Sequence, residues 1–525
     1  MMPRSNPGKP TPSQNRPASE RPEHDGGGSM DNIVSQVVYG PARRTPERPA
    51  LVTRAGEVFT YAQMADAVGQ LAGHLRARGL HPGQVVGLSM GGHPFHLLTL
   101  LALAQVGAVS LPLHPAVPAE RRLLAARRFD AACVVSESPE FALPGLDFIG
   151  LDRSEFRADG PPDRRIHPVA ADDPMHMLAT SGTSGDPKVV VWTHGNVALR
   201  NRTAEPGDSS PKRVLQMDLN FFVGIGPAMR ALAHADTLVF PASPAAEHVL
   251  LALLTQRITH AYLAPYQASL LAGLVGANVG PVCPHLESLR IVGDHLTAPL
   301  KDLLCRRLTP NVYVAYGAVE VGVVTMATPD MLARHPESVG TTCPWADVQV
   351  VDAMDREVPA NTAGEIRIRS AQMVGGYHRD EARTRGRFRA GWFYPGDHGH
   401  VDAEGFLHTE GRIDDMLNVG GAMVDAQDIE KTLGLHPVVL QAGAFLSEAP
   451  DGRPILSAAL VLTDAGRLEE VRTFAQAKLG PLAPARYVLA QMLPRTGTGK
   501  LQRRLLAAAF PLSPPAPPVP PRPAA

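Results

Sequence analysis

The segment from Thr180 to Lys188 has the composition of a loop that wraps a polyphosphate. It reads Thr-Ser-Gly-Thr-Ser-Gly-Asp-Pro-Lys, so small, hydroxylated and flexible residues lead up to a single cation. Glycine lets backbone N–H groups approach a ligand without a Cβ in the way, hydroxyl groups donate further hydrogen bonds, and lysine supplies a compact positive charge. The residues that we expect to contact phosphate are Thr180, Ser181, Gly182, Thr183, Ser184, Gly185 and Lys188.

The sequence on either side of this loop is apolar. It reads Met-His-Met-Leu-Ala before the loop and Val-Val-Val-Trp after it, which predicts that the loop joins two strands. The loop is not a Walker A motif, because that motif would need glycine at Pro187 and serine or threonine at Val189. Taken alone, the segment is also compatible with a polar turn between two strands.

A second candidate begins at Tyr316, which ends the apolar stretch Asn-Val-Tyr-Val-Ala and precedes Gly317. An aromatic ring at a strand end beside a glycine can stack on a base, and the carboxylate of Glu320 can hold Mg²⁺. Asp397 lies in a tight turn, Tyr-Pro-Gly-Asp-His, where its carboxylate can bind both hydroxyls of a ribose. Taken singly, these residues are equally typical of a core tyrosine beside a turn and of a turn aspartate.

Two further candidates come late in the chain. Arg412 precedes a pair of aspartates, the first of which is Asp414, and Lys500 stands at the tip of a Gly-Thr loop. The alternatives are a polar hairpin and a solvated lysine. His398 and His400 have a spacing that metal ligands can have, and we interpret them as an exposed loop pair.

Composition limits the class of protein. A chain of 525 residues is too long for one hydrophobic core and predicts two to four domains or subdomains. Its net charge of −1 gives no support for a nucleic-acid or membrane-surface partner. The four cysteines show no C-x-x-C spacing, which fits a reducing cytoplasm and gives no support for a zinc or disulfide framework. The longest apolar run, residues 97–106, is about half as long as a membrane span.

The central part of the chain has an α/β pattern. Thr60 and Gln63 form a capping box that predicts a helix, because apolar residues follow at helical spacing. A buried strand at 84–90 and a helix at about 94–106 continue an alternation that predicts mostly parallel sheets with helices on both faces. From about residue 346, apolar and polar residues alternate between turns, as in a small antiparallel sheet or barrel.

These patterns divide the chain into four parts. Residues 1–29 are rich in proline, glycine, serine and charge and lack an apolar signal segment, so we expect a disordered leader and consider Met30 a candidate start. Residues 30–412 are expected to form an N-terminal domain and residues 413–510 a smaller C-terminal domain. Residues 511–525 are proline-rich and are expected to form a disordered tail.

Taken together and in this order, the segments resemble the motifs of the adenylate-forming superfamily, which comprises acyl-CoA synthetases, adenylation domains and luciferases. The resemblance covers about residues 45–508, and five ordered motifs are not expected to coincide by chance. It implies a large N-terminal domain of two doubly wound α/β subdomains plus a small β-barrel, followed by a small mobile α+β lid. The matching motifs are the phosphate loop (TSG-[ST]-[ST]-G-x-PK), Tyr316–Glu320 (YGxTE), Tyr394–Asp397 ([YF]-x-TGD), Gly411–Asp415 (GRxDD) and Pro494–Lys500 (PxTxxGK).

The resemblance also implies a reaction. A carboxylate attacks the α-phosphorus of ATP, pyrophosphate leaves, and a thiol of CoA or of a carrier protein then attacks the acyl-adenylate. Because both reactants of the first step are anions, the site must neutralise charge and align the attack. The implied roles are carboxylate and α-phosphate binding for Lys500, Mg²⁺ binding for Glu320, β- and γ-phosphate binding for Thr180, Ser181, Thr183 and Lys188, adenine stacking for Tyr316 beside Gly317, ribose binding for Asp397 and Arg412, and the lid hinge for Asp414.

Four positions depart from the family pattern. Val319 replaces the threonine of YGxTE, and Pro395 replaces the threonine of TGD. Val189 stands where glycine usually follows the loop lysine, and Asn418 stands where many relatives have lysine. A lost hydrogen bond to a charged group costs about 1.5–3 kcal/mol if nothing replaces it. The departures therefore bear on rate or substrate more than on ATP binding.

Two segments bear on the acid that is activated. Phe221 is aligned with the family's aromatic gate, and Phe222 stands where amino-acid-activating relatives place an aspartate for the α-ammonium group. An α-amino acid substrate is therefore disfavoured. Gly293, Asp294 and His295 are expected in the pocket wall, where two polar residues indicate an acid other than a plain fatty chain, or alternatively face the adenine.

We interpret the sequence as a cytoplasmic acid–thiol ligase that uses ATP and Mg²⁺ to convert a small-molecule acid into an acyl-CoA. One alternative is a stand-alone adenylation enzyme that loads the phosphopantetheine of a carrier protein in trans, or that adenylates an oxyanion other than a carboxylate. Another is a degenerate nucleotide-binding protein without turnover, which Val319 and Pro395 favour and which Lys500 and Glu320 oppose.

Overall fold

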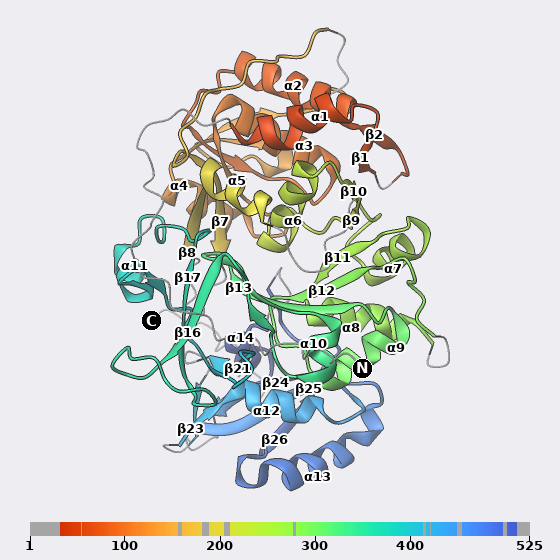
Figure 1. The fold of residues 1–525 in the computed structure, drawn as a ribbon, viewed down its shortest axis with the longest axis vertical. Helices are drawn as coiled ribbons and strands as arrows, with labels where there is room; N and C mark the ends of the chain where they lie inside the picture. The colour runs from red at the N-terminus through yellow and green to blue at the C-terminus, as the bar shows by residue number, and fades with distance from the viewer. Residues whose placement is uncertain are drawn as a thin grey trace, which may run out of the picture.

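The computed structural model of the protein describes ten stretches of the chain. The N-terminal helices and the first sheet lie at one end of the molecule, and the segment after residue 416 lies at the other (Figure 1). The phosphate-loop residues 181–187, Asp414 and Lys500 lie outside the described residues. The described stretches are residues 32–53, 55–155, 160–180, 188–203, 211–276, 280–412, 416–419, 422–448, 454–496 and 501–511.

The first sheet has six strands in the order β6-β5-β3-β4-β7-β8. Its neighbouring strands run parallel except for β7 and β8, which are antiparallel and flank the phosphate loop as the sequence predicted. Their register pairs Thr180 with Lys188, so the two ends of the loop meet. The strands are β3 (Val85–Leu88), β4 (Val109–Pro112), β5 (Ala131–Ser136), β6 (Asp147–Gly150), β7 (Pro174–Thr180) and β8 (Lys188–Thr193).

The second sheet has nine strands in the order β15-β14-β13-β12-β11-β9-β10-β1-β2. Its six central strands are parallel, and antiparallel strands close both edges. The strands are β1 (Pro49–Val52), β2 (Val58–Thr60), β9 (Arg213–Leu215), β10 (Thr237–Val239), β11 (His260–Leu263), β12 (Ser288–Val292), β13 (Val312–Ala318), β14 (Gly322–Ala327) and β15 (Thr341–Thr342).

Helices pack around these sheets. The predicted capping box begins α2, since the Thr60 side chain accepts from the Gln63 N–H and the Gln63 side chain accepts from the Thr60 N–H. The apolar run at 97–106 lies in α3, a buried core helix. The longer helices are α2 (Tyr61–Ala77), α3 (Pro94–Val106), α4 (Ala119–Arg128), α5 (His194–Arg202), α6 (Phe222–Ala233), α7 (Ala246–Thr255), α8 (Pro265–Leu274) and α9 (Ala298–Arg307). Short helical segments are η1 (Ser35–Tyr39), α1 (Gly40–Arg44), η2 (Pro139–Phe141), α10 (Pro329–Arg334) and α11 (Glu381–Arg387).

The alternating pattern after residue 346 forms a third, antiparallel sheet. The described strands pair as β18-β19-β17-β20-β21, with β16 also on β17, and these pairings do not close into a barrel. The strands are β16 (Ala346–Val351), β17 (Gly364–Ser370), β18 (Phe388–Arg389), β19 (Trp392–Phe393), β20 (Asp397–Val401) and β21 (Leu407–Arg412).

The C-terminal segment has a hydrophobic core of its own. Buried side chains of α12, β24, β25 and α13 pack together, among them Ile429, Leu433, Leu460 and Val471. Its elements are β22 (Met416–Val419), β23 (Ala422–Asp425), α12 (Ala426–Gly434), β24 (Val439–Glu448), β25 (Pro454–Leu462), η5 (Ala465–Arg467), α13 (Leu468–Leu479), η6 (Gly480–Leu482), β26 (Arg486–Leu489) and α14 (Arg503–Ala509). Within the described stretches, every helix is too short or too polar to span a bilayer.

Two histidines are buried in the first subdomain. His176, on β7, lies 2.7 Å from the Ser110 hydroxyl through Nδ1, and its Nε2 is buried without a hydrogen-bond partner. Burial, together with the charge of the nearby His96, lowers the pKa of His176 to about 3. Burial likewise lowers the pKa of His96 to about 4. Both rings are therefore neutral in the folded protein at neutral pH.

We expect the free energy of unfolding to fall as the pH drops below about 6.5, because the unfolded chain then binds protons that the buried His176 does not. At about pH 5 the loss amounts to roughly 2 kcal/mol for one such histidine. Urea denaturation at several pH values measures it. His176→Leu should flatten the pH dependence, whereas the exposed-site variant His81→Gln should leave it unchanged; equal slopes in all three proteins would contradict the assignment.

Candidate active site

A cavity of about 360 Å³ brings together residues that are far apart in the sequence. It opens at the carboxyl ends of β11, β12 and β13, where parallel sheets commonly bind ligands. Gln427 of α12 also lines it, so the C-terminal segment closes part of the wall. The sequence-predicted residues in the lining are Lys188, Phe222, Gly293, Asp294, His295, Tyr316, Gly317, Glu320, Asp397 and Arg412.

A bulge at the end of β13 sets the position of Tyr316. The antiparallel pairing with β14 shifts register between Tyr316 and Gly317. A Cβ on Gly317 would collide with the Gly322 carbonyl oxygen and lie 2.9 Å from the Val323 Cα, so a larger residue does not fit. The close approach of the two strands therefore requires glycine directly beside the tyrosine.

A shared carboxylate joins the second and third sheets at this point. The Tyr316 hydroxyl donates to Asp397 Oδ2 at 2.7 Å, and Arg412 Nε lies 3.2 Å from Asp397 Oδ1. Asp397 and Arg412 face each other across β20 and β21. Burial raises the pKa of Tyr316, and the charge of Asp397 raises it further. The phenol therefore stays protonated and acts as a hydrogen-bond donor.

A buried carboxylate, that of Glu320, follows Tyr316 in the sequence. Glu320 is 7% exposed, and the Tyr377 hydroxyl donates to its Oε1 at 2.8 Å. The ammonium group of Lys188 lies 5.3 Å from the centre of the Tyr377 ring, which is a cation–π distance. Tyr377 was not identified from the sequence; its signal was only a tyrosine after the glycine pair that follows β17.

Arg200, which the sequence analysis also missed, braces the cavity wall from α5. Its Nη2 donates to the main-chain oxygens of Val319 and Gln372, both at 3.1 Å. Its guanidinium lies 4.2 Å from the ring centre of Trp192 and 5.7 Å from that of Phe222. Burial lowers the pKa of Arg200 to about 9, while the charge of Glu320 opposes that shift. The Arg200 cation is thus fixed against the rings of Trp192 and Phe222, close to the buried Glu320.

The two adjacent phenylalanines have different surroundings. Phe222 begins α6, lines the cavity and packs edge-to-face on Trp192 at 5.5 Å. Phe221 precedes the helix, is absent from the cavity lining and lies 5.6 Å from the His114 ring. Asp218 bonds to His114 at 2.9 Å rather than facing the cavity. Of the two phenylalanines, Phe222 is therefore the one that lines the cavity.

The turn after β12 connects the cavity to the C-terminal segment. Gly293 has φ of +89°, a left-handed conformation that favours glycine. Arg495 Nη1 lies 3.9 Å from Asp294 Oδ2, and its guanidinium lies 4.9 Å from the Tyr266 ring centre. Burial lowers the pKa of His295 to about 4, with the charge of Lys431 adding to the effect, so this imidazole is neutral at neutral pH.

The fold and the cavity define an α/β protein with a cavity, lined by both charged and apolar side chains, at the carboxyl ends of parallel strands. Residues 40–378 match the family model of AMP-binding enzymes. The chain is 29% identical over 482 residues to a feruloyl-CoA synthase of Amycolatopsis sp, covering 88% of this chain and 95% of that protein. It is 26% identical over 490 residues to a 2-succinylbenzoate–CoA ligase of Bacillus cereus (strain Q1), covering 91% and 98%. The chain belongs to the AMP-binding enzyme family.

Solved structures show the same fold. The o-succinylbenzoate-CoA synthetase MenE of Bacillus subtilis, in complex with the acyl-adenylate intermediate OSB-AMP, superposes with a TM-score of 0.79 at 21% identity, covering 90% of this chain and 97% of that one. The likeness extends across both the N-terminal sheets and the C-terminal segment, because the coverage of both chains is nearly complete.

We expect Asp397→Asn to weaken AMP binding by about 10- to 150-fold, since a hydrogen bond to a charged group contributes about 1.5–3 kcal/mol. Tyr316→Phe keeps the ring and removes only the hydroxyl bond to Asp397, so a smaller loss is expected. Isothermal titration calorimetry with AMP measures both. The exposed-site variant Asp330→Asn is the control. Unchanged AMP affinity in Asp397→Asn would remove this carboxylate from the nucleotide site.

Proposed function

We propose that this protein activates a carboxylic acid as its acyl-adenylate, with release of pyrophosphate, and transfers the acyl group to the thiol of CoA. The observation that carries the proposal is that one cavity is lined by two kinds of group. One is the hydrogen-bonded set of Tyr316, Asp397 and Arg412, and the other is Phe222, which packs on Trp192. A nucleotide bound by the first group and an acid bound against the second would lie in the same cavity.

The charges of the cavity suit a reaction between two anions. Lys188 and Arg412 line it, and Arg200 fixes a third cation in its wall. Such preorganised positive groups stabilise the charge that develops at the α-phosphate. Lys500, outside the described residues, is proposed to bridge the carboxylate and the α-phosphate, as the motif resemblance implies. Asp414, also outside them, is proposed as the hinge that moves Lys500 between the two half-reactions.

Glu320 fits the role of a Mg²⁺ ligand. Its carboxylate is buried in the cavity that Lys188 also lines, and the hydrogen bond from Tyr377 holds one of its oxygens in place. Hard oxygen ligands suit Mg²⁺, which in nucleotide sites commonly binds one or two carboxylates and the substrate phosphates. When bound, the ion would neutralise phosphate charge, and Tyr377 would act as the residue that orients its ligand.

We propose an aromatic acid without an α-amino group as the substrate. Phe222 gives the cavity an aromatic wall, and no carboxylate of the described segment 217–222 lines the cavity to receive an ammonium group. The similar proteins named above include a feruloyl-CoA synthase, and another relative is a 3-hydroxybenzoate–CoA ligase of Aromatoleum sp. (strain CIB), 26% identical over 510 residues.

Loading of a carrier protein in trans is the second candidate. The chain is 27% identical over 517 residues to the phosphinothricin tripeptide synthetase PhsC of Streptomyces viridochromogenes, of which it covers 46%. The two readings share the adenylation step and differ only in the thiol that accepts the acyl group.

Pyrophosphate release, measured across aromatic, aliphatic and α-amino acids, tests the adenylation step. Adding either CoA or a phosphopantetheinylated carrier protein then identifies the acceptor by mass spectrometry of the thioester. We expect an aromatic acid to give the fastest release and CoA to accept it. If none of the acids gives pyrophosphate release although AMP binds, the protein is a nucleotide-binding protein without turnover and the proposal is contradicted.

Lys500→Ala is the control for this assay. It should slow pyrophosphate release by at least about a hundredfold, the effect of removing one charge-stabilising group. It should retain thioester formation from acyl-adenylate made beforehand, because the α-phosphate bond is then already formed. Lys478→Ala, an exposed lysine of α13, should behave as the unaltered protein in both half-reactions.

Phe222→Ala should change the preference among acids by at least about tenfold, because a wall residue of a hydrophobic pocket discriminates on that scale. The enlarged cavity should favour bulkier acids. Phe221→Ala, the adjacent residue outside the cavity lining, should leave the order of preference unchanged. Ratios of kcat/KM for a small and a bulky acid measure the effect. A shift in Phe221→Ala alone would restore Phe221 as the gate.

A further inference from the structure

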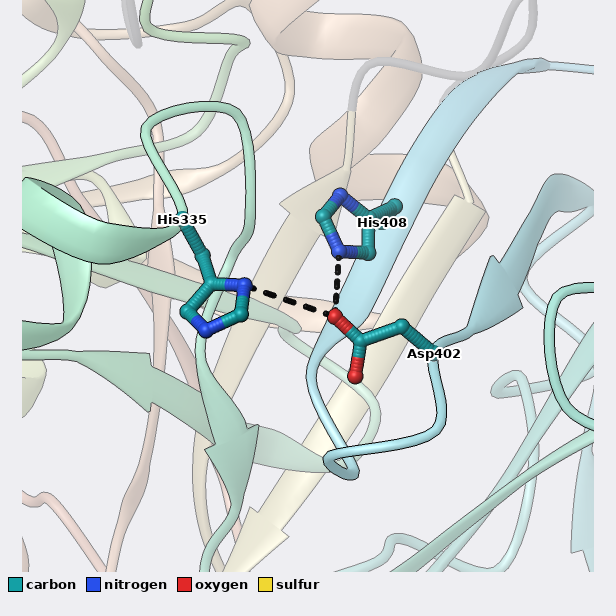
Figure 2. A group of neighbouring side chains, drawn as sticks. All are labelled: His335, Asp402 and His408. Carbon is teal, nitrogen blue, oxygen red and sulfur yellow. Dashed lines mark hydrogen bonds and ion pairs between the residues drawn. The ribbon is translucent and has the colours of Figure 1, made fainter.

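Three side chains meet at the turn between β20 and β21, away from the proposed catalytic groups. His335 follows α10, Asp402 begins the turn and His408 lies on β21. Figure 2 shows both imidazole rings pointing toward one oxygen of the carboxylate. Each residue is only partly exposed, with side-chain exposures of 16%, 16% and 22% respectively. The cluster is therefore sheltered but reachable from solvent.

The distances suit a bound ion. His408 Nε2 lies 3.1 Å and His335 Nδ1 lies 3.5 Å from Asp402 Oδ2. One ligand atom from each of the three residues lies within 4.8 Å of the other two. Tetrahedral ligands at bonds of about 2.1 Å are roughly 3.4 Å apart. A small movement of one imidazole would therefore place all three atoms around a single ion.

The surroundings hold two of these groups in orientation. Asp402 Oδ1 accepts from the N–H groups of Glu404 and Phe406, both at 2.9 Å, so Oδ2 is the oxygen turned toward the histidines. The His335 ring stacks on Phe406 with centroids 3.9 Å apart. Outer contacts of this kind are what fix the direction of metal-binding side chains.

The His335 ring lies between two carboxylates, which favours a cation beside it. His335 Nδ1 faces Asp402, and its Nε2 lies 3.5 Å from Glu404 Oε2. A neutral imidazole has one N–H, and ionised carboxylates only accept hydrogen bonds, so one of these contacts would oppose lone pairs. A metal ion on Nδ1 resolves the conflict, because the remaining N–H then donates to Glu404. A second proton on the ring is the rival solution.

We propose that His335, Asp402 and His408 form a site for a borderline divalent metal ion such as Zn²⁺. Two imidazoles and one carboxylate are donors that Zn²⁺ and Co²⁺ bind well, whereas Mg²⁺ and Ca²⁺ prefer sets of oxygen ligands. The three ligands leave at least one position for water. The site is separate from Glu320, and it goes beyond the proposed ligase activity. Thr409, the residue after His408, lines the cavity, so the ion would brace the strand that borders it.

The test is a titration of the full-length, chelator-treated protein with Zn²⁺, and separately with Co²⁺, in excess Mg²⁺ and without ATP. Calorimetry should give one ion per chain, and Co²⁺ should show the visible absorption of a low-coordinate site with nitrogen ligands. His335→Gln and His408→Gln should each weaken binding by more than about a hundredfold, and Glu404→Gln by about tenfold. Asp402→Asn keeps the oxygen that accepts from the turn, so it should fold and still lose affinity.

His398→Gln is the matched control, since His398 is a half-exposed histidine of β20 that lies 3.6 Å from the carboxylate of Glu410. It should bind the ion as the unaltered protein does. Absence of stoichiometric binding, or equal binding by the His335, Asp402 and His408 variants, would overturn the site in favour of protonated histidines. Loss of binding only in His398→Gln would also overturn the site, because the ion would then be bound at His398. Pyrophosphate release is a separate readout, so failure of the metal site leaves the proposed ligase activity standing.

Discussion

The site depends on one shared carboxylate. Asp397, on the third sheet, is held by the Tyr316 hydroxyl from the second sheet and by Arg412 from the neighbouring strand. The two sheets, which also share a hydrophobic core, are thereby joined at the cavity, and a tyrosine ring is fixed with them at its wall. Hydrogen bonds to an ionised group are stronger than neutral ones, and this pair is only partly exposed. The geometry of this part of the cavity wall therefore follows from how the sheets meet.

Both main departures from the family motifs are at positions where the main chain already has a structural role. The Val319 oxygen accepts from Arg200 and from Trp192 Nε1, and the Pro395 oxygen accepts from Arg412. A side-chain hydroxyl is missing at each position, but the backbone stays tied to charged or aromatic neighbours that belong to other elements. These hydrogen bonds use main-chain oxygens, which any residue carries, so valine at 319 and proline at 395 both make them.

Local patterns in the sequence predicted much of the fold, because helix caps, strand alternation and turns depend on residues that are close in the sequence. The capping box of α2, the strands on either side of the phosphate loop and the alternation of the third sheet all correspond to observed elements. Arg200 and Tyr377 gave no such signal, since each acts through partners more than fifty residues away. The sequence placed both Phe221 and Phe222 in the substrate pocket, whereas of these two only Phe222, at the start of α6, lines the cavity. Contacts between distant segments, and the direction of one side chain at a helix start, are set by tertiary packing.

The contact between Asp294 and Arg495 gives the cavity wall a thermodynamic link to the C-terminal segment. Asp294 lines the cavity, and Arg495 lies on the stretch that leads to Lys500. An acid that moves the 293–295 turn must therefore change the stability of this arrangement of the C-terminal segment. By linkage, the arrangement must change the affinity for that acid by the same factor. Selectivity among acids would then depend on the contact between the cavity wall and the C-terminal segment as well as on the cavity itself. Different acids would be distinguished by how much they stabilise this contact and by how well they fit the cavity.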